Sequence, residues 1–263
     1  MLEKVRAENP IVHCITNHVV SNFQANGLLA LGASPIMGEA PEEAAELAAL
    51  ADAVSLNIGT LNSQSLNSML IAGKTANGLG TPVVLDPVGV GATEFRKNAV
   101  NKILEEVRVS VIRCNAGELA AIVGADWQAK GVDAGEGKGN VGELARTAAK
   151  RYGLVVAVSG ETDFVTDGEQ LSKIRYGHKT MAAITGTGCL LSAAVAAFLA
   201  VYPKAHFEAT AAAMRYYAIA GELASRQAEF PGEFQRAFLD RLAAIDEDEL
   251  DKFMNQKEGE LKR

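Results

Sequence analysis

The stretch AVSLNIGTLNSQSLNSMLIAGKTANGLGTPVVLD, residues 53–86, contains the pattern that decides the fold. Two short apolar runs, at 53–57 and 83–86, flank a segment with a helical pattern at 63–77. A strand, a helix and a second strand in this order form a βαβ unit, whose two strands lie parallel. The stretch therefore predicts a parallel sheet with a helix packed on its face.

The same alternation continues on both sides of this unit. Further strands are predicted at 11–15, 35–37, 110–113 and 154–159, and further helices at 20–31, 41–51, 94–106 and 141–152. Alternation of this kind is typical of a mostly parallel central sheet covered by helices on both faces. With 263 residues and 48% hydrophobic content, the chain fits one large α/β domain over residues 1–263.

The alternation of strands and helices ends after the strand at 154–159. A hairpin is predicted at 163–176 with its turn at Asp167-Gly168, and nearly all of the chain from Gly188 onward is predicted to be helical. The Gly- and Asp-rich segment 124–140 is expected to be a surface loop, and the charged tail 246–263 is expected to fray.

Composition excludes several classes of protein. The net charge is −7 and no Lys/Arg block is present, which argues against a nucleic-acid partner. The longest apolar run, 190–202, is shorter than the roughly 20 residues of a membrane span and predicts a buried helix. The charged N-terminus does not resemble a signal peptide, and Cys14, Cys114 and Cys189 stand singly, so the expected compartment is the reducing cytoplasm.

Polar and glycine-containing segments follow the predicted strands. Ligands of open α/β sheets bind outside the carboxyl ends of the strands, so these segments are candidates for a site. A single such segment is equally well explained as the turn that any strand needs, but six together favour a convergent pocket. They are Thr16-Asn17-His18, Met37-Gly38, Asn57-Ile58-Gly59, Asp86-Pro87-Val88-Gly89, Arg113-Cys114-Asn115 and Ser159-Gly160.

The segment Gly186-Thr187-Gly188-Cys189 leads directly into an apolar helix. Its glycines allow backbone N–H groups to approach an anion, and the helix adds its positive N-terminal end at the same point. This pattern predicts a site for a transferring phosphoryl group; the alternative is a glycine turn packed under a buried helix. The field of the helix is expected to lower the pKa of the Cys189 thiol, unless this cysteine is simply a buried structural residue.

Two carboxylates are candidates for organising a metal ion or phosphates. Asp86 ends a predicted strand, and Glu118 opens the helix that follows Asn115. Mg²⁺ keeps several waters and uses few protein carboxylates, so Glu118 could hold it through water. The competing interpretations are a turn or N-cap aspartate at Asp86 and a first-turn glutamate that complements the helix dipole at Glu118.

The sequence resembles the hydroxyethylthiazole kinase family of the ribokinase-like superfamily, from about residue 9 to residue 230. The glycine loop alone indicates the superfamily, and its combination with Ser-Pro-Ile-Met and a cysteine is more specific. The motifs that carry the resemblance are HCITN at 13–17, ASPIM at 33–37, NIGTL at 57–61, DPVG at 86–89, the stretch from Arg113 to Glu118 and the loop from Gly186 to Cys189.

This resemblance implies ATP-dependent phosphorylation of the small-molecule alcohol 4-methyl-5-(2-hydroxyethyl)thiazole, a step of thiamine salvage. It further implies a homotrimer with sites at the subunit interfaces. The implied roles are thiazole binding for Met37, Gly186, Asn17 and Gly59, ATP binding for Arg113, Ser159, Thr187 and Gly188, Mg²⁺ and phosphate organisation for Asp86 and Glu118, and a catalytic role for Cys189. Gly117 stands where the family more often has serine.

Two questions stay open at this stage. Cys189 could accept the proton of the substrate hydroxyl or only position that hydroxyl. The rival functions are a kinase of another small alcohol such as a hydroxymethylpyrimidine, a nucleotide-dependent dehydratase of the same fold, and a non-catalytic sensor. A cysteine rather than an aspartate at position 189 counts against the dehydratase, and the joint presence of Asp86, Arg113 and Glu118 counts against the sensor.

Overall fold

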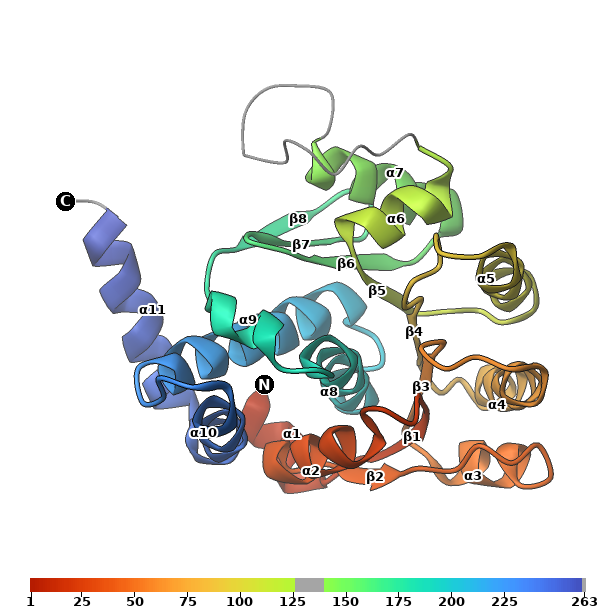
Figure 1. Cartoon of the computed structure of the whole chain (residues 1–263), viewed down its shortest axis with the longest axis horizontal. Coiled ribbons are helices and arrows are strands. Elements are labelled where there is room, and N and C mark those ends of the chain that lie inside the picture. Colours follow the sequence, from red (N-terminus) through yellow and green to blue (C-terminus); the bar gives the residue numbers. More distant parts are fainter. Residues whose placement is uncertain (126–139, 262–263) are drawn as a thin grey trace.

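The computed structural model describes residues 1–125 and 140–261 (Figure 1). Within these residues the strands form a single eight-stranded sheet in the order β2-β1-β3-β4-β5-β6-β7-β8. Pairing is parallel from β2 through β6, and β7 and β8 are added antiparallel. The strands are β1 (Ile11–Ile15), β2 (Ser34–Ile36), β3 (Ala53–Asn57), β4 (Val83–Asp86), β5 (Val111–Asn115), β6 (Val155–Ser159), β7 (Asp163–Thr166) and β8 (Leu171–Ile174).

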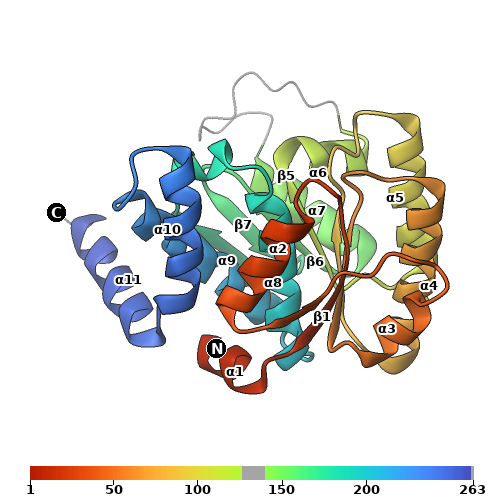
Figure 2. The same cartoon turned by 60° about the horizontal axis from the view of Figure 1, so that its bottom comes forward.

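Helices cover both faces of the sheet, which confirms the predicted fold class (Figures 1 and 2). One face carries α3 (Ala44–Leu50), α4 (Ser63–Leu79), α5 (Glu94–Glu106), α6 (Ala116–Val123) and α7 (Val141–Tyr152). The other face carries α1 (Leu2–Glu8), α2 (Ser21–Leu31), α8 (Thr187–Val201), α9 (His206–Ser225) and α10 (Pro231–Ala244). Each face encloses its own apolar cluster, so a central strand such as β3 is buried along its whole length.

Local sequence signals explain where the elements begin and end. Asn62 accepts a hydrogen bond from the Ser65 N–H and forms a capping box that starts α4. Gly80 ends this helix in the left-handed conformation, with φ of 77°. The apolar run predicted to be a buried helix forms α8, which is buried on every side from Leu190 to Leu199.

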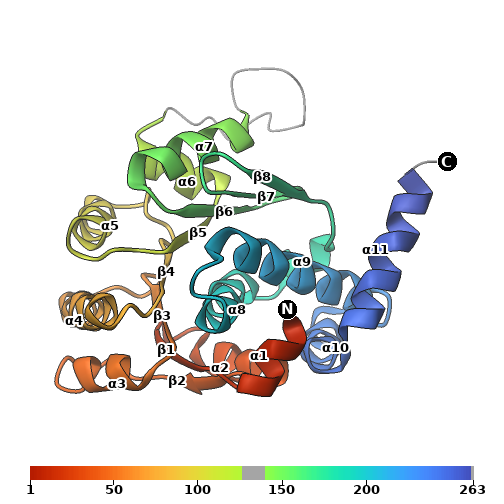
Figure 3. The same ribbon diagram turned by 180° about the vertical axis from the view of Figure 1, so that it is seen from behind.

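The predicted hairpin is confirmed, and its turn contains Gly168 with φ of 101°. The expectation for the charged tail is wrong, because residues of the tail form helix α11 (Glu247–Leu261). This helix lies beside α9 and α10, as the view from behind shows (Figure 3). Its Phe253 side chain is only 6% exposed, so tertiary packing stabilises a segment whose composition suggested fraying. The predicted surface loop at 124–140 falls almost entirely outside the described residues.

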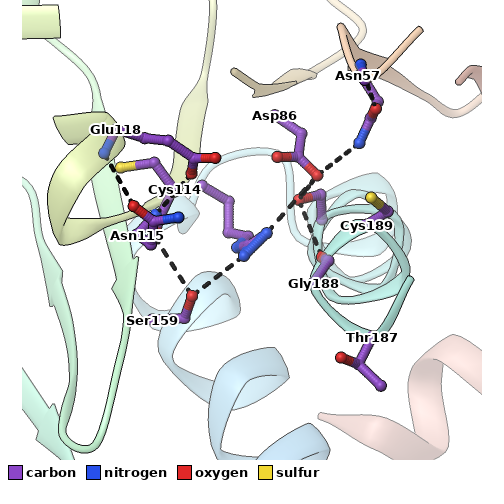
Figure 4. Close-up of polar contacts among 12 residues, drawn as sticks. Asn57, Asp86, Cys114, Asn115, Glu118, Ser159, Thr187, Gly188 and Cys189 are labelled. Atoms are coloured by element: carbon purple, nitrogen blue, oxygen red, sulfur yellow. Dashed lines mark hydrogen bonds and ion pairs between the residues drawn. The ribbon is translucent and has the colours of Figure 1, made fainter. Parts of the chain in front are cut away.

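The parallel strands bring their carboxyl ends to one edge of the sheet. Asn57 of β3 pairs in register with Asp86 of β4, and Asn115 of β5 pairs with Ser159 of β6. Residues that are far apart in the chain therefore meet at this edge, next to the N-terminus of α8 (Figure 4).

Candidate active site

The glycine loop is held in place by the elements around it. Gly186 has φ of 96°, and a Cβ atom here would lie 2.6 Å from the Val20 Cγ1. A larger residue would therefore meet both backbone strain and a clash. Thr187 Oγ1 donates to the Met181 carbonyl at 2.9 Å, and the Tyr217 hydroxyl donates to the Thr187 carbonyl at 2.6 Å.

The N-terminus of α8 is free to bind an anion. Among the described residues no side chain caps this helix end, so the first-turn N–H groups receive no side-chain acceptor. The helix dipole gives these groups a partial positive charge. The segment Gly186-Thr187-Gly188-Cys189 therefore presents a helix start without a side-chain cap among the described residues.

Asp86 lies at the centre of a buried polar network (Figure 4). Its Oδ2 accepts hydrogen bonds from Asn57 Nδ2 at 2.7 Å and Ser192 Oγ at 2.9 Å, and it lies 3.6 Å from Arg113 Nη1. Its Oδ1 is buried and has no partner among the described residues. Burial raises the pKa of Asp86, although Arg113, Ser192 and Asn57 act in the opposite direction.

Arg113 connects this network to the glycine loop. The guanidinium is buried and donates to Ser159 Oγ at 3.1 Å. A Cβ atom at Gly188 would lie 2.9 Å from Arg113 Nη2, so a larger residue there would have to displace the guanidinium. Burial alone would lower the pKa of Arg113, but the charges of Asp86 and Glu118 raise it, and the group is a permanent cation beside the loop.

Both carboxylate oxygens of Glu118 accept hydrogen bonds from backbone N–H groups. Its Oε2 accepts from the Asn115 N–H and its Oε1 accepts from the Gly89 N–H, each at 2.9 Å. Asn115 in turn accepts from the Glu118 N–H, which completes a capping box at the start of α6. Glu118 therefore joins the ends of β4 and β5, and its charge raises the pKa of Asp86.

Cys189 lies near the amides that follow β1 and β3. Asn17 Nδ2 donates to Cys189 Sγ at 3.4 Å and to Asn57 Oδ1 at 2.9 Å. Gly59 allows this arrangement, because a Cβ atom there would lie 2.7 Å from Asn17 Nδ2. The structure thus brings together Asn17, Gly59 and Cys189.

The prediction that the helix field lowers the thiol pKa is wrong. Burial and the charge of Asp86 raise the pKa of Cys189, and the hydrogen bonds from Asn57 and Asn17 offset only part of this effect. Desolvation disfavours the thiolate and is the largest of these effects. Near neutral pH the group is therefore a thiol.

Met37 lies at the edge of the group of residues around Cys189 and Asp86. It follows β2 and packs half-buried against the larger apolar cluster. The carbonyl of the next residue, Gly38, lies 2.8 Å from His13 Nε2, and His13 is fully buried. Met37 is thus held at the carboxyl edge of the sheet, with β1 and β3 between its strand and that of Asp86.

Sequence reasoning missed two residues of the site. Ser192 lies one helical turn after Gly188, so the helical repeat places it on the same face of α8, toward Asp86. Arg96 donates to the carbonyls of Ile58, Gly59 and Val88, and thereby ties together the loops after β3 and β4. The spacing from Gly188 is a usable signal for Ser192, whereas Arg96 is identified only by its tertiary contacts.

A cavity of about 740 Å³ opens next to the glycine loop. Arg113, Ser159, Thr187 and Gly188 line it, together with a wall formed by residues 176–182. The volume suits a ligand of the size of a nucleotide, since binding pockets for such molecules measure roughly 300–1,000 Å³. The predicted nucleotide-binding residues therefore share one cavity.

The cavity also contains a buried carboxyl group. Asp163 is 8% exposed and accepts a hydrogen bond from the Gly160 N–H at 2.9 Å. Burial raises the pKa of Asp163 to about 6, against the opposing effects of this hydrogen bond and of Arg113. Asp163 thus fixes the turn that follows Ser159.

No helix in the described part of the chain is long and apolar enough to cross a membrane. No group of three or more His, Cys, Asp or Glu side chains in residues 1–125 and 140–261 could hold a metal ion by itself.

Comparison with known proteins agrees with this geometry. The hydroxyethylthiazole kinase from Exiguobacterium is 55% identical over 239 residues, which cover 91% of this chain and 90% of that protein. The structure of the hydroxyethylthiazole kinase protein from Pyrococcus horikoshii is 42% identical, covers 95% of this chain and 94% of that chain, and superposes with a TM-score of 0.87. An ADP/ATP-dependent NAD(P)H-hydrate dehydratase from Bacillus subtilis, crystallised with ATP and Mg²⁺, shares the fold at 14% identity with a TM-score of 0.56, over 92% of this chain and 96% of that chain.

The family assignment rests on most of the chain. Residues 2–248 match the model of the hydroxyethylthiazole kinase family. The loop, the buried Asp86–Arg113 pair and the cavity all lie within this range. The chain is a member of the hydroxyethylthiazole kinase family, with the ribokinase-like fold.

Proposed function

We propose that this chain transfers the γ-phosphoryl group of ATP to the hydroxyl of 4-methyl-5-(2-hydroxyethyl)thiazole. The observation that carries the proposal is that Arg113, which pairs with the buried Asp86, and the uncapped start of α8 line one cavity. Phosphoryl transfer depends on positioning and on charge stabilisation, and these groups supply both. Membership of the family supports the choice of the alcohol.

The nucleotide would occupy the cavity of about 740 Å³. Arg113 would contact its phosphates while Ser159 holds the guanidinium from the other side. The N–H groups from Thr187 to Cys189 would donate hydrogen bonds to the transferred group, because they stand at the start of a helix and have no side-chain acceptor within the described residues.

Asp86 and Glu118 are the residues that would organise Mg²⁺. The buried Asp86 Oδ1, which has no partner in the described part of the chain, fits a carboxylate that contacts a cation directly or through water. Glu118 uses both oxygens for backbone N–H groups but keeps lone pairs for a bound water. Mg²⁺ bound here would neutralise phosphate charge during the transfer.

The alcohol would lie against Asn17, Gly59, Gly186 and Cys189, with Met37 on its apolar side. Asn17 already contacts both Cys189 and Asn57, so the polar wall of this subsite is preorganised. The raised pKa of Cys189 supports positioning of the hydroxyl over proton acceptance, because a protonated thiol is a poor base. A loose transition state makes little demand on a base.

Further parts of the proposal rest on the family. We infer that residues 1–263 work as one kinase domain in the cytoplasm, in thiamine salvage. The proposed assembly is a homotrimer with active sites at the subunit interfaces. Val19, 71% exposed beside the alcohol subsite residue Asn17, is one apolar group that such an interface could cover.

A coupled assay of ADP release tests the function. The purified protein is incubated with Mg²⁺ and ATP and with hydroxyethylthiazole, a hydroxymethylpyrimidine or no alcohol, and products are identified by mass. We expect ADP and thiazole phosphate in equal amounts. Absence of ADP above the no-alcohol background would overturn the proposal, and preference for the pyrimidine would change the substrate.

A further inference from the structure

Helix α11 begins at Glu247, next to the end of the segment that matches the family, at residue 248. It nevertheless contacts the wall of the nucleotide cavity. Its Phe253 ring packs edge-on against Tyr176, with ring centroids 6.0 Å apart and planes at 67°. Tyr176 in turn lines the cavity of about 740 Å³. A side chain from the C-terminal helix therefore supports this wall from behind.

The helix is anchored to the body at the end of α9. Lys257 pairs with Glu222 at 2.8 Å, and the guanidinium of Arg226 lies 5.0 Å from the centre of the Phe253 ring. Phe253 is 6% exposed. Its ring is thus held in a fixed place, as a support requires.

The wall itself has little regular structure of its own. Residues 176–182 include only part of a short 3-10 helix, η1 (Lys179–Ala183). Met181 fits into a notch at Gly221 of α9, where a Cβ atom would lie 2.3 Å from its sulfur. The position of the wall is therefore set by what packs behind it, namely α9 at Met181 and α11 at Tyr176.

We infer that Phe253 is a positioning residue for nucleotide binding, which acts by holding Tyr176 in the cavity wall. The inference rests on the proposed function, since it takes the cavity as the nucleotide site. Arg113 and Gly188 line the polar part of the cavity, and Tyr176, Met181 and Ala218 line an aromatic and apolar part that suits the flat face of a nucleobase. Phe253 does not touch the phosphates or the alcohol, so its effect falls on nucleotide affinity.

The test compares Phe253→Ala with Met254→Ala. Both residues are apolar side chains of the same helix, but Met254 lines a separate cavity of about 230 Å³ between α11 and the helices α1, α8 and α9. We expect Phe253→Ala to raise the KM for ATP by about three- to tenfold. The kcat and the KM for the alcohol should stay within about twofold in the same variant. Met254→Ala should leave all three constants near the wild-type values while lowering Tm.

Two further variants separate positioning from folding. Phe253→Tyr keeps the ring and should restore the KM for ATP, whereas Phe253→Leu should not. In a double-mutant cycle, adding Phe253→Ala to Tyr176→Ala should raise the KM for ATP no further, because both changes remove one contact. An unchanged KM in Phe253→Ala, an equal rise in Met254→Ala, or additive effects in the cycle would each overturn the inference.

Calorimetry with ADP in the absence of alcohol distinguishes this inference from the proposed function. If the wild type does not bind ADP, the proposed function fails and the inference fails with it. If the wild type binds ADP and Phe253→Ala binds equally well, only the inference fails. Weaker ADP binding by Phe253→Ala but not by Met254→Ala supports it.

Discussion

Asp86 and Glu118 are carboxylates at the same edge of the sheet, but their surroundings differ. Asp86 is fully buried, and one of its oxygens has no partner among the described residues. Glu118 is half-buried, and both of its oxygens accept backbone N–H groups. An unpaired buried oxygen costs stability unless a ligand uses it, whereas a capped helix gains stability from its glutamate. Two acidic residues with the same expected role therefore differ: the surroundings of Asp86 favour ligand binding, whereas those of Glu118 favour stabilisation of the fold.

The largest expected effect is that of Asp86→Asn. We expect kcat to fall by about 10²–10³-fold, the range found when a charge-stabilising group is removed from an active site. Folding should persist with a lowered Tm, because the amide has the same shape as the carboxylate but leaves the buried Arg113 guanidinium without its counter-charge. Steady-state kinetics and thermal unfolding of the same preparation check both points. Activity within tenfold of the wild type would remove Asp86 from the machinery.

The effect of Glu118→Gln on activity should be smaller than that of Asp86→Asn. The amide keeps one acceptor but loses the other, so the capping box is weakened by about 1 kcal/mol. We expect kcat to fall by about tenfold and the Mg²⁺ concentration for half-maximal rate to rise. Titration of activity with Mg²⁺ and measurement of Tm separate the two effects. A loss as large as that of Asp86→Asn, with unchanged Tm, would show that the two carboxylates are functionally equivalent.

Substitutions of Cys189 test whether this residue accepts a proton although the charge of Asp86 disfavours its thiolate. Because burial and Asp86 raise the pKa of Cys189, we expect Cys189→Ser to keep kcat within about tenfold of the wild type. The matched variant is Cys189→Asp, which introduces a carboxylate at the same position. If Cys189→Asp is active and Cys189→Ser loses at least about 10²-fold, proton acceptance matters and the positioning role is wrong.

The smallest expected effect on activity is that of Asp163→Asn, which instead alters the pH dependence of stability. Burial raises the pKa of Asp163 from 3.8 to about 6 in the folded state. Between these values the folded protein binds more protons than the unfolded chain, so the free energy of unfolding falls as pH rises. The group's contribution is complete below pH 3.8 and is lost as pH passes about 6, with a total change of about 3 kcal/mol.

Denaturant unfolding at several pH values between 4.5 and 7 checks this expectation. Asp163→Asn should remove this part of the pH dependence and therefore gain stability relative to the wild type as pH rises. The amide oxygen can still accept from the Gly160 N–H, so the turn should remain. A stability difference that stays constant across this range, or that grows toward low pH in favour of the variant, would contradict the assignment.

Much of the fold follows from local pattern. The strands at 53–57 and 83–86 and the helices at 94–106 and 141–152 have the predicted bounds, because buried parallel strands are uninterrupted apolar runs and polar or glycine residues bound them. Helix α11 was not predicted, because contacts between distant parts of the chain stabilise it and no local apolar pattern marks it. Its sequence is highly charged, and Phe253 packs against Tyr176 and Arg226, which are distant in the chain.

The α/β class, the glycine loop and the residue types at each strand end can be predicted from the sequence, because these depend on periodicity and on backbone freedom within a few residues. Tertiary structure decided which strand ends meet, that Ser192 and Arg96 belong to the site, and that Glu118 is held by Gly89 and Asn115. It also reversed the expected direction of the Cys189 pKa. Burial and the approach of a second charge depend on contacts between distant parts of the chain, so a local pattern does not reveal them.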